Sequence, residues 1–280
     1  MAKGLSVHVG LNALDAAQYG GFDGILNGCE ADANDMYALA ESKGYKPKLI
    51  LTKDATAANV TAAIEDVAKA LASGDIFFLS YSGHGGQVPD TNGDEIDGLD
   101  ETWALYDRQL IDDELYALWA KFKPGVRILL LSDSCHSGTV SRAMEFEVIT
   151  SIPRLVTPYT DDTIKGSRAL PPKVAMDDFE ARKAMYEKIQ RGLPEGDAVN
   201  VGASVLLISG CKDEQLSSDG ARNGLFTETL LKVWHKGGFK GSYLLFYDKL
   251  KKRMPGWQQP NLSMVGTQND AYEKESPFSI

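Results

Sequence analysis

Uninterrupted apolar runs alternate with helix-periodic segments along most of the chain. The apolar runs lie at about 5–11, 48–51, 75–81, 126–132 and 203–210. The helical patterns lie at about 30–43, 57–72, 113–121, 224–234 and 243–253. Strands that are apolar on both faces and alternate with helices are typical of a mostly parallel sheet covered on both sides. The pattern therefore predicts an α/β fold.

One interval, 141–200, departs from this rhythm. No strand pattern continues through it, it holds five of the chain's 11 prolines, and only 178–191 looks helical. A segment of this length inside a domain is typical of a functional lid, an insertion or a linker. In α/β sheets ligands bind beyond the carboxyl ends of the strands, so the loops at that edge are the first candidates for a site.

Two predicted strands end at reactive side chains. The sequence FFLSYSGHGG places His84 after the third apolar run, and ILLLSDSCHSG places Cys135 after the fourth. An unperturbed thiol has a pKa of about 8.5, so it needs a nearby base to act as a nucleophile at neutral pH. Parallel strand ends can supply that proximity, and the flanking glycines leave backbone N–H groups free to hold an oxyanion. The pairing favours a Cys/His site over a small buried cysteine.

The other histidines and Cys211 have simpler interpretations. His136 follows Cys135 directly, and adjacent residues of an extended segment point to opposite sides, so His136 is a poor candidate for the base. His8 lies within an apolar strand, and we expect a hydrogen-bonded core residue there. His235 is expected to serve a helix C-terminus. Cys211 follows an apolar run and is expected in the core.

The chain resembles the metacaspases, including the bacterial members called orthocaspases, in the motifs SGHGG around His84 and DSCHSG around Cys135. The likeness extends over most of the chain outside 141–200, through NGCEADA, DGLDETW, IDDELY and SGCKDEQLSSDGARNGLFTETLLKVW. True caspases carry a different cysteine motif, Q-A-C-x-G. The resemblance implies a caspase-like fold, in which a six-stranded, mostly parallel sheet has helices on both faces.

The resemblance also implies a domain organisation. It predicts one peptidase domain over 1–280. Within it, 1–140 resembles a large subunit with the His/Cys dyad, 141–200 is an inserted linker or lid, and 201–280 resembles a small subunit.

Site residues follow from the same resemblance. Cys135 would be the nucleophile, His84 the general acid/base, and the backbone N–H groups of Gly85 and Cys135 the oxyanion hole. Metacaspases cut after Arg or Lys, and the positions that match their substrate pocket are Asp32, Ser82 and Asp133, with Cys29 nearby. Carboxylates suit a guanidinium or ammonium group that leaves water. From the residues alone, Asp32 could equally complement a helix dipole and Asp133 could cap a loop.

An acidic interval precedes the predicted 113–121 helix. Oxygen-rich clusters suit calcium, but an EF-hand requires glycine where Glu95 stands, and a solvated acidic loop is the alternative. Many metacaspases bind calcium through four aspartates, three of which match Asp100, Asp112 and Asp113. The fourth position is Arg142, whose positive charge opposes a second cation. We therefore expect no required cofactor and an activity that does not depend on calcium.

Composition limits the partners. The 29 basic and 39 acidic residues give a formal charge of −10, which argues against a nucleic acid or an anionic membrane as the main partner. The three cysteines lie in different local contexts, which argues against a disulfide framework, and the N-terminal segment lacks a signal-peptide pattern. We expect a cytoplasmic monomer whose partners are protein or peptide substrates.

The sequence thus favours a cysteine endopeptidase that cuts after Arg or Lys through a thioester acyl-enzyme. Two alternatives stay open: a caspase-like module that binds partners without cleaving them, and a calcium-binding regulatory protein. The peptidase is also expected to cut itself within 141–200, because nicking concentrates in accessible loops. The basic residues in the irregular part of that interval are Arg154, Lys165, Arg168 and Lys173.

Overall fold

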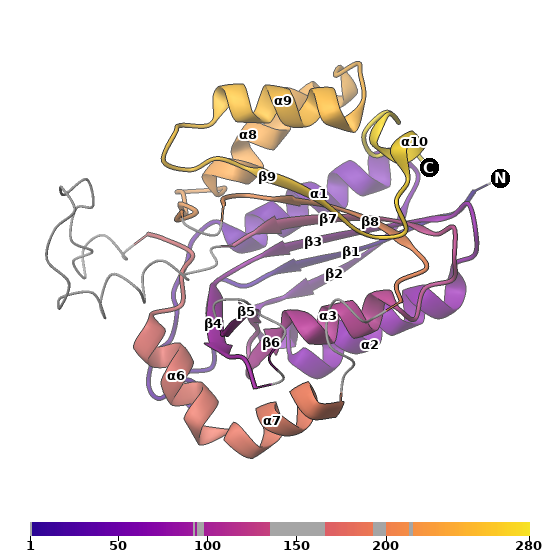
Figure 1. Ribbon diagram of the computed structural model, residues 1–280. Helices are drawn as coiled ribbons and strands as arrows, with labels where there is room; N and C mark the ends of the chain where they lie inside the picture. The colour runs from indigo at the N-terminus through magenta and orange to yellow at the C-terminus, as the bar shows by residue number, and fades with distance from the viewer. Residues whose placement is uncertain (1, 92, 94–97, 135–165, 193–199, 213–214) are drawn as a thin grey trace, which may run out of the picture.

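The computed structural model describes residues 2–91, 93, 98–134, 166–192, 200–212 and 215–280. Its central strands are β1 (Gly4–Gly10), β2 (Lys46–Leu51), β3 (Ile76–Ser82), β7 (Arg127–Asp133), β8 (Ser204–Ser209) and β9 (Asn261–Gly266). They form a six-stranded sheet in the order β2-β1-β3-β7-β8-β9 (Figure 1). All neighbours are parallel except β8 and β9, which are antiparallel. The predicted α/β class with a mostly parallel sheet is confirmed.

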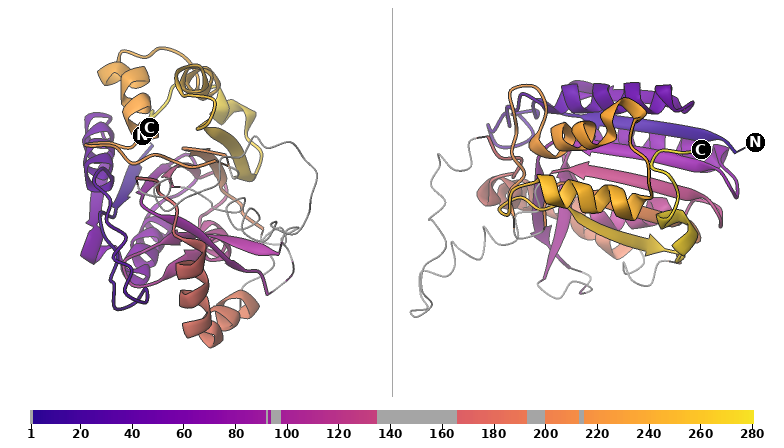
Figure 2. Two further views of the ribbon diagram at one scale, coloured as in Figure 1. Left: turned by 90° about the vertical axis from the view of Figure 1, so that its left-hand side faces the viewer. Right: turned by 90° about the horizontal axis from the view of Figure 1, so that it is seen from above.

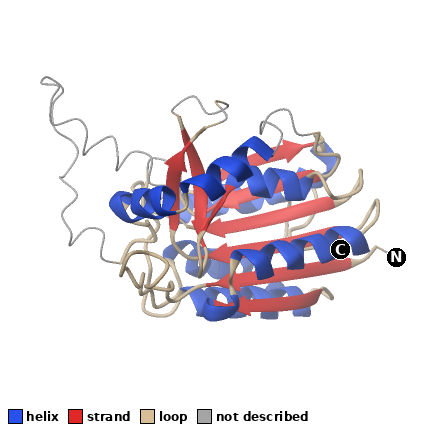
Figure 3. Ribbon diagram, turned by 90° about the horizontal axis from the view of Figure 1, so that it is seen from below, coloured by secondary structure: helices blue, strands red, loops and turns tan. Residues whose placement is uncertain are grey.

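Helices cover both faces of this sheet (Figures 1 and 3). One face carries α1 (Cys29–Ser42), α8 (Leu225–Trp234) and α9 (Tyr243–Arg253), and the other carries α2 (Ala57–Ala70) and α3 (Asp112–Trp119). Because side chains alternate along a strand, Phe78 and Leu129 pack with α8 and α9, whereas Phe77 and Ile128 pack with α2 and α3. The continuous apolar runs of the sequence therefore serve two cores. Short helical turns are η1 (Thr52–Asp54), η4 (His235–Gly237) and α10 (Asp270–Glu273).

Local sequence signals explain where several helices begin and end. The side chain of Thr56 accepts a hydrogen bond from the Asn59 N–H at the start of α2, and Ser242 caps α9 in the same way. Gly44 follows α1 with a positive φ of 90°, which a residue with a side chain rarely adopts. His235, as expected, is the C-terminal cap of α8.

A small antiparallel sheet stands beyond the carboxyl end of β3 (Figure 1). It consists of β4 (Gly85–Pro89), β5 (Leu99–Ala104) and β6 (Gln109–Ile111). The alternative of a solvated acidic loop between His84 and α3 is therefore wrong over β5 and β6. Acidic residues at the start of β5 made this strand resemble a solvated loop in the sequence. In the structure Asp100 is buried, and its carboxylate accepts a hydrogen bond from Gln190.

The single helix predicted at 178–191 corresponds to parts of two helices, the first of which begins earlier, at Pro172. These are α6 (Pro172–Ala181) and α7 (Lys183–Gly192), which are separated at Arg182, where φ is −120° and ψ is 19°. Edge strand β9 was also absent from the predicted elements.

The edge formed by the carboxyl ends of the parallel strands lies away from the chain termini. The N- and C-terminal residues lie near each other at the opposite end of the sheet (Figure 2). In the part of the chain that the structure describes, no helix is both long and apolar enough to cross a membrane. The described residues of the predicted active site lie in and beside the loops at the carboxyl edge of the sheet.

Candidate active site

The ends of β3 and β7 bring the predicted site segments together. Ser82 and Asp133, the last residues of these strands, are partners in the parallel register. His84 follows two residues after Ser82, and all three side chains are buried. The expected convergence of the two strand ends is thus observed. Cys135 comes two positions after Asp133 in the sequence and, like Arg142, lies outside the described residues.

His84 is held as a neutral imidazole with one free nitrogen. Its Nε2 lies 3.0 Å from the carbonyl oxygen of Gly24, so Nε2 carries the proton and donates. Its Nδ1 is buried and has no hydrogen-bond partner within the described part of the chain. Burial lowers the pKa of His84 to about 4. At neutral pH the ring therefore presents an unprotonated Nδ1 that can take up a proton.

A buried arginine fills the predicted substrate pocket. The Arg168 side chain is 0% exposed, and its Nη2 and Nη1 lie 2.7 and 2.8 Å from carboxylate oxygens of Asp32 and Asp133. Nη1 also donates to Ser82 Oγ at 2.8 Å. Asp219 places a third carboxylate 3.1 Å from Nη2. The three pocket residues named from the sequence thus surround one guanidinium group.

Other groups hold the pocket carboxylates in place. Asp32 accepts hydrogen bonds from Asn223 Nδ2 at 2.9 Å and from the Gly224 N–H at 3.2 Å. Asp133 accepts from the N–H and the hydroxyl of Thr227, at 3.2 and 2.8 Å. Gly224 and Thr227 lie at the N-terminus of α8, whose helix dipole favours negative charge. The pocket is therefore built to keep two carboxylates in fixed positions.

The charges in the pocket do not balance. Burial raises the pKa of Asp32 to about 6, although Arg168 acts in the opposite direction. Burial lowers the pKa of Arg168, but Asp133 and the other acidic neighbours outweigh it and hold that pKa well above its ordinary value. Three carboxylates and one guanidinium leave an excess of negative charge, so the pocket strongly favours a cationic occupant.

Gly224 also gives the guanidinium its space. A Cβ atom at Gly224 would lie 2.5 Å from Cζ of Arg168, which is far inside van der Waals contact. The φ of Gly224 is −62°, so the constraint on this position is steric and not conformational. The absence of a side chain here is what allows a long cationic side chain to reach the carboxylates.

Sequence reasoning did not identify Asp219, Asn223 or Gly224 as pocket residues. All three follow β8 within the stretch SSDGARNG, which contributed to the family resemblance. Their position after the carboxyl end of another parallel strand was an available signal. Asp219 is fixed by the backbone N–H groups of Asn27 and Gly28 at 2.6 and 3.0 Å, ahead of α1.

The two described cysteines are buried and unpaired by disulfides. Cys29 is the first residue of α1, and burial raises its pKa to about 12. Its surroundings include Ser82 and Arg168, so it lies beside the pocket with an unreactive thiol. Cys211 is buried as expected, and its Sγ lies 3.3 Å from the carbonyl oxygen of Ser134. It therefore borders the site.

The three candidate calcium ligands lie around the small sheet. Asp100 belongs to β5, and Asp112 and Asp113 open α3. In the described part of the chain, no group of three or more His, Cys, Asp or Glu side chains is placed to hold a metal ion. Gln190 Nε2 donates a hydrogen bond to the buried carboxylate of Asp100, so this carboxylate has a protein partner in place of a metal ion. Within the described ranges, Asp100, Asp112 and Asp113 therefore do not form a metal-binding cluster on their own.

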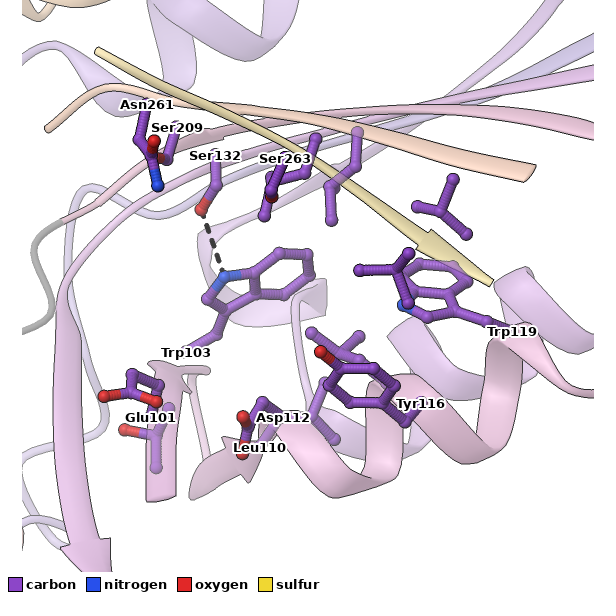
Figure 4. A pocket seen from close by; sticks show the side chains of 16 residues that line it. Glu101, Trp103, Leu110, Asp112, Tyr116, Trp119, Ser132, Ser209, Asn261 and Ser263 are labelled. Carbon is purple, nitrogen blue, oxygen red and sulfur yellow. Dashed lines mark hydrogen bonds between the residues drawn. The ribbon is translucent and has the colours of Figure 1, made fainter. Parts of the chain in front are cut away.

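Asp112 also borders a separate cavity of about 270 Å³ on the α3 face of the sheet (Figure 4). Trp103 lies in this cavity, and its Nε1 donates to Ser132 Oγ at 3.2 Å. Ser132 in turn lies 2.9 Å from Ser134 through their hydroxyl groups. The cavity thus connects to the end of β7 but does not include the arginine pocket.

Comparison with known proteins shows the family to which the chain belongs. Residues 14–275 match the peptidase family described as Caspase domain. Metacaspase-1 of Mycosarcoma maydis is 32% identical over 235 residues, which is 75% of this chain and 57% of that protein. Metacaspase-1 of Saccharomyces cerevisiae is 31% identical over 271 residues, or 85% of this chain and 62% of that protein. The chain therefore spans less than two thirds of the length of these relatives.

Two solved structures are similar to the structure of this chain. Protein GSU0716 from Geobacter sulfurreducens is 50% identical with a TM-score of 0.86, over 99% of this chain and 98% of that chain. Caspase-1 from Spodoptera frugiperda is 10% identical with a TM-score of 0.50, over 95% of this chain and 86% of that chain, and shows the fold alone.

Proposed function

The chain belongs to the caspase-domain family of peptidases, and from this premise we propose that it is a cysteine endopeptidase that cuts after Arg or Lys. Cys135 serves as the nucleophile and His84 as the general acid/base. The observation that carries the proposal is the Arg168 guanidinium, which three buried carboxylates surround in the pocket named from the sequence. A site that holds an arginine of its own chain in this way has the chemistry to select one in a substrate.

The pocket geometry supports a preference for Arg over Lys. The two terminal nitrogens of Arg168 reach different carboxylates, Asp32 and Asp133. A guanidinium group offers this fork, whereas an ammonium group is a single point of charge on a flexible stem. An acidic or apolar side chain would leave the carboxylates buried without a cation, which is strongly unfavourable. We therefore expect the order Arg, then Lys, with Asp and Leu far below.

The chemical steps follow from the neutral His84. Its Nδ1 takes the proton of the Cys135 thiol, and the thiolate attacks the substrate carbonyl carbon. The Gly85 N–H donates to the developing oxyanion, a contribution of about 10²- to 10³-fold in rate for one such donor. His84 then gives its proton to the leaving amine, and water hydrolyses the thioester.

Further parts of the proposal rest on the sequence. We infer that the enzyme acts as a cytoplasmic monomer, that it needs no calcium because Arg142 replaces an acidic ligand, and that it cuts itself within 141–200. Binding without cleavage, or a calcium-regulated role, are the competing functions.

A fluorogenic peptide panel tests the proposal. Peptides with Arg, Lys, Asp or Leu before the cleavable bond are incubated with wild type and Cys135→Ala, in calcium and in chelator. We expect wild type to cleave the Arg peptide at least about 100-fold faster than the Leu peptide, because a buried polar site discriminates strongly against an unpaired side chain. The variant should be inactive. Equal activity of both proteins would rule out the nucleophile, and peptide binding without turnover would favour the binding module.

A further inference from the structure

The segment 166–170 lies in the candidate active site, where isolated β-bridges pair its backbone on both sides. On one side, the Gly85 N–H donates to the Arg168 carbonyl oxygen at 2.9 Å, and the Leu170 N–H donates to the Gly85 carbonyl oxygen at 2.7 Å. Gly85 and Ala169 thereby form a parallel bridge. The backbone of 166–170 is thus paired with the first residue of β4, next to His84.

The other side of the segment is paired as well. The Arg168 N–H donates to the Ser217 carbonyl oxygen at 2.9 Å, and the Asp219 N–H donates to the Gly166 carbonyl oxygen at 2.8 Å. Ser167 and Ser218 form an antiparallel bridge between them. Extended peptides bind by this kind of strand addition, in which backbone hydrogen bonds supply affinity and side-chain pockets supply specificity.

Two parts of Arg168 meet two different parts of the catalytic machinery. Its side chain fills the carboxylate pocket, and its carbonyl oxygen accepts from Gly85, the proposed oxyanion donor. A structural ion pair would require only the first of these contacts. A substrate residue whose carboxyl side is cleaved must make both contacts, because its side chain enters the pocket and its carbonyl oxygen must reach the oxyanion donor.

The Arg168–Ala169 bond is also close to the reactive groups. Gly85, which directly follows His84 in the chain, forms backbone hydrogen bonds with Arg168 and Leu170, the residues on either side of Ala169. Ala169 packs with Cys211, whose thiol donates to the carbonyl oxygen of Ser134. Ser134 directly precedes Cys135 in the chain. The described neighbours of the bond are therefore those that flank the proposed base and nucleophile.

We propose that 166–170 is an internal substrate, and that the enzyme hydrolyses its own Arg168–Ala169 bond as its first turnover. This inference rests on the proposed function. The Cys135 sulfur bonds to the Arg168 carbonyl carbon, the bond to the Ala169 nitrogen breaks, and His84 passes the thiol proton to that nitrogen. Water then adds to the thioester, which releases the Arg168 carboxylate and regenerates the thiol.

The two products stay together through the sheet. They are fragments 1–168 and 169–280, and β8 in the second fragment pairs with β7 in the first along six positions of register. Until the bond is cut, the segment excludes other peptides from the pocket. Peptide-cleaving activity therefore appears with the cut.

The internal substrate also indicates which external substrates fit. Ser167 and Ala169, the neighbours of Arg168, are both buried, and Leu170 is fully buried in the core beneath β4. Small side chains on both sides of the arginine and an apolar one after them match these surroundings. We expect peptides of the pattern Gly-Ser-Arg-Ala-Leu to be better substrates than peptides with bulky residues next to Arg.

Intact-mass analysis during incubation tests the proposal, with peptide activity measured in parallel. Wild type should convert to 1–168 and 169–280 and gain peptide activity at the same rate, whereas Cys135→Ala should stay whole. Arg168→Lys should be cut at the same bond more slowly, by about tenfold or more, and Arg168→Ala should not be cut there. Arg191→Ala is the matched control, because the Arg191 side chain is 71% exposed and pairs with Glu187 on α7, away from the carboxylate pocket, and its loss should leave the cut unchanged.

The outcomes separate this inference from the proposed function. Wild type that cleaves Arg peptides but keeps its Arg168–Ala169 bond overturns the inference, even if Arg168→Ala raises peptide turnover, because the segment would then be an inhibitor and not a substrate. Wild type that cleaves no peptide overturns the proposed function itself. If Arg168→Ala fails to fold, the comparison of wild type with Cys135→Ala and Arg168→Lys still decides.

Discussion

Arg168 Nη1 lies 2.8 Å from the carboxylate of Asp133, and neither side chain is more than 3% exposed. Water screens a buried pair of this kind only weakly, so removal of either partner takes away a strong interaction from the other buried charge. Asp133 also accepts hydrogen bonds from Thr227, and Ser217 Oγ donates to it at 2.7 Å. The carboxylate is thus held by the fold, and the cation is the exchangeable partner.

We predict that Asp133→Asn weakens cleavage after Arg. The amide keeps the shape of the side chain but removes one of the three carboxylates around a bound guanidinium, and breaking a buried ion pair in this way costs about 3–5 kcal/mol. This corresponds to a fall in kcat/KM of roughly 150- to 5,000-fold. Asp248→Asn is the control, because Asp248 forms an exposed pair with Lys252 at 2.6 Å, and such pairs contribute little. Unchanged kinetics in Asp133→Asn would show that Asp133 does not contact the substrate.

We predict that Gly224→Ala blocks the pocket without altering its charge. The added Cβ would overlap the guanidinium position, and overpacking of this kind costs about 1–3 kcal/mol, or roughly 5- to 150-fold in kcat/KM for Arg peptides. Gly256→Ala is the matched control, since a Cβ there meets nothing within 4 Å. If both variants cleave Arg peptides like wild type, substrate arginine does not occupy the Arg168 site.

We predict that His84→Ala lowers kcat by about 10²- to 10⁴-fold, because a positioned general base contributes about that much. Cys135→Ala should show no detectable turnover. His235→Asn is the control, because His235 adopts a left-handed conformation that asparagine tolerates, at the end of α8. Steady-state assays on an Arg peptide provide the measurement. Substantial thiol-dependent turnover in His84→Ala would mean that another group acts as the base.

We predict that the stability of the protein falls on acidification, in part through His8. Its ring is fully buried in β1, with Nδ1 2.8 Å from Ser80 Oγ and Nε2 2.9 Å from Ser6 Oγ, as expected for a hydrogen-bonded core histidine. Burial lowers the pKa of His8 from its ordinary value of 6.5 to about 3. The unfolded state therefore binds the proton more tightly, and stability decreases as the pH falls from 6.5 towards 3.

Thermal unfolding of wild type and His8→Asn between pH 4.5 and 7.5 measures this contribution. The variant is expected to be less stable at every pH but to lose less on acidification than wild type. His84 acts in the same direction and Asp32 in the opposite one, and both are present in the two proteins, so the difference in slope isolates His8. Parallel curves would contradict the prediction.

We predict that chelators leave peptide cleavage largely unchanged. This expectation rests on Arg142, a residue outside the described ranges, and on the described aspartates that do not assemble a site. Assays with calcium and with chelator provide the test, and calorimetric titration with calcium provides an independent readout. A strict calcium requirement would show that the remaining carboxylates suffice. Arg142→Asp should introduce calcium binding.

The sequence by itself determined the class of fold and pointed to the edge of the sheet where the candidate site lies. Continuous apolar runs predicted strands that are buried on both faces, and helical periodicity predicted the helices that cover them. Both patterns are visible in the sequence because each strand or helix must place apolar side chains on its own buried faces. The two motifs at strand ends pointed to the edge where β3 and β7 meet. Asp32, Ser82 and Asp133 came from the family resemblance, since local pattern alone left helix and loop roles open for the two aspartates.

The tertiary structure alone decided which distant segments complete the site. Arg168 belongs to an interval without strand periodicity, and nothing local distinguishes it from Arg154 or Lys173 as a basic residue in a proline-rich stretch. Its place among the carboxylates depends on backbone pairing with Gly85 and Ser217, which lie far from it in the chain. Such pairing depends on how strand ends and loops meet in space, and periodicity along the chain carries no record of that arrangement.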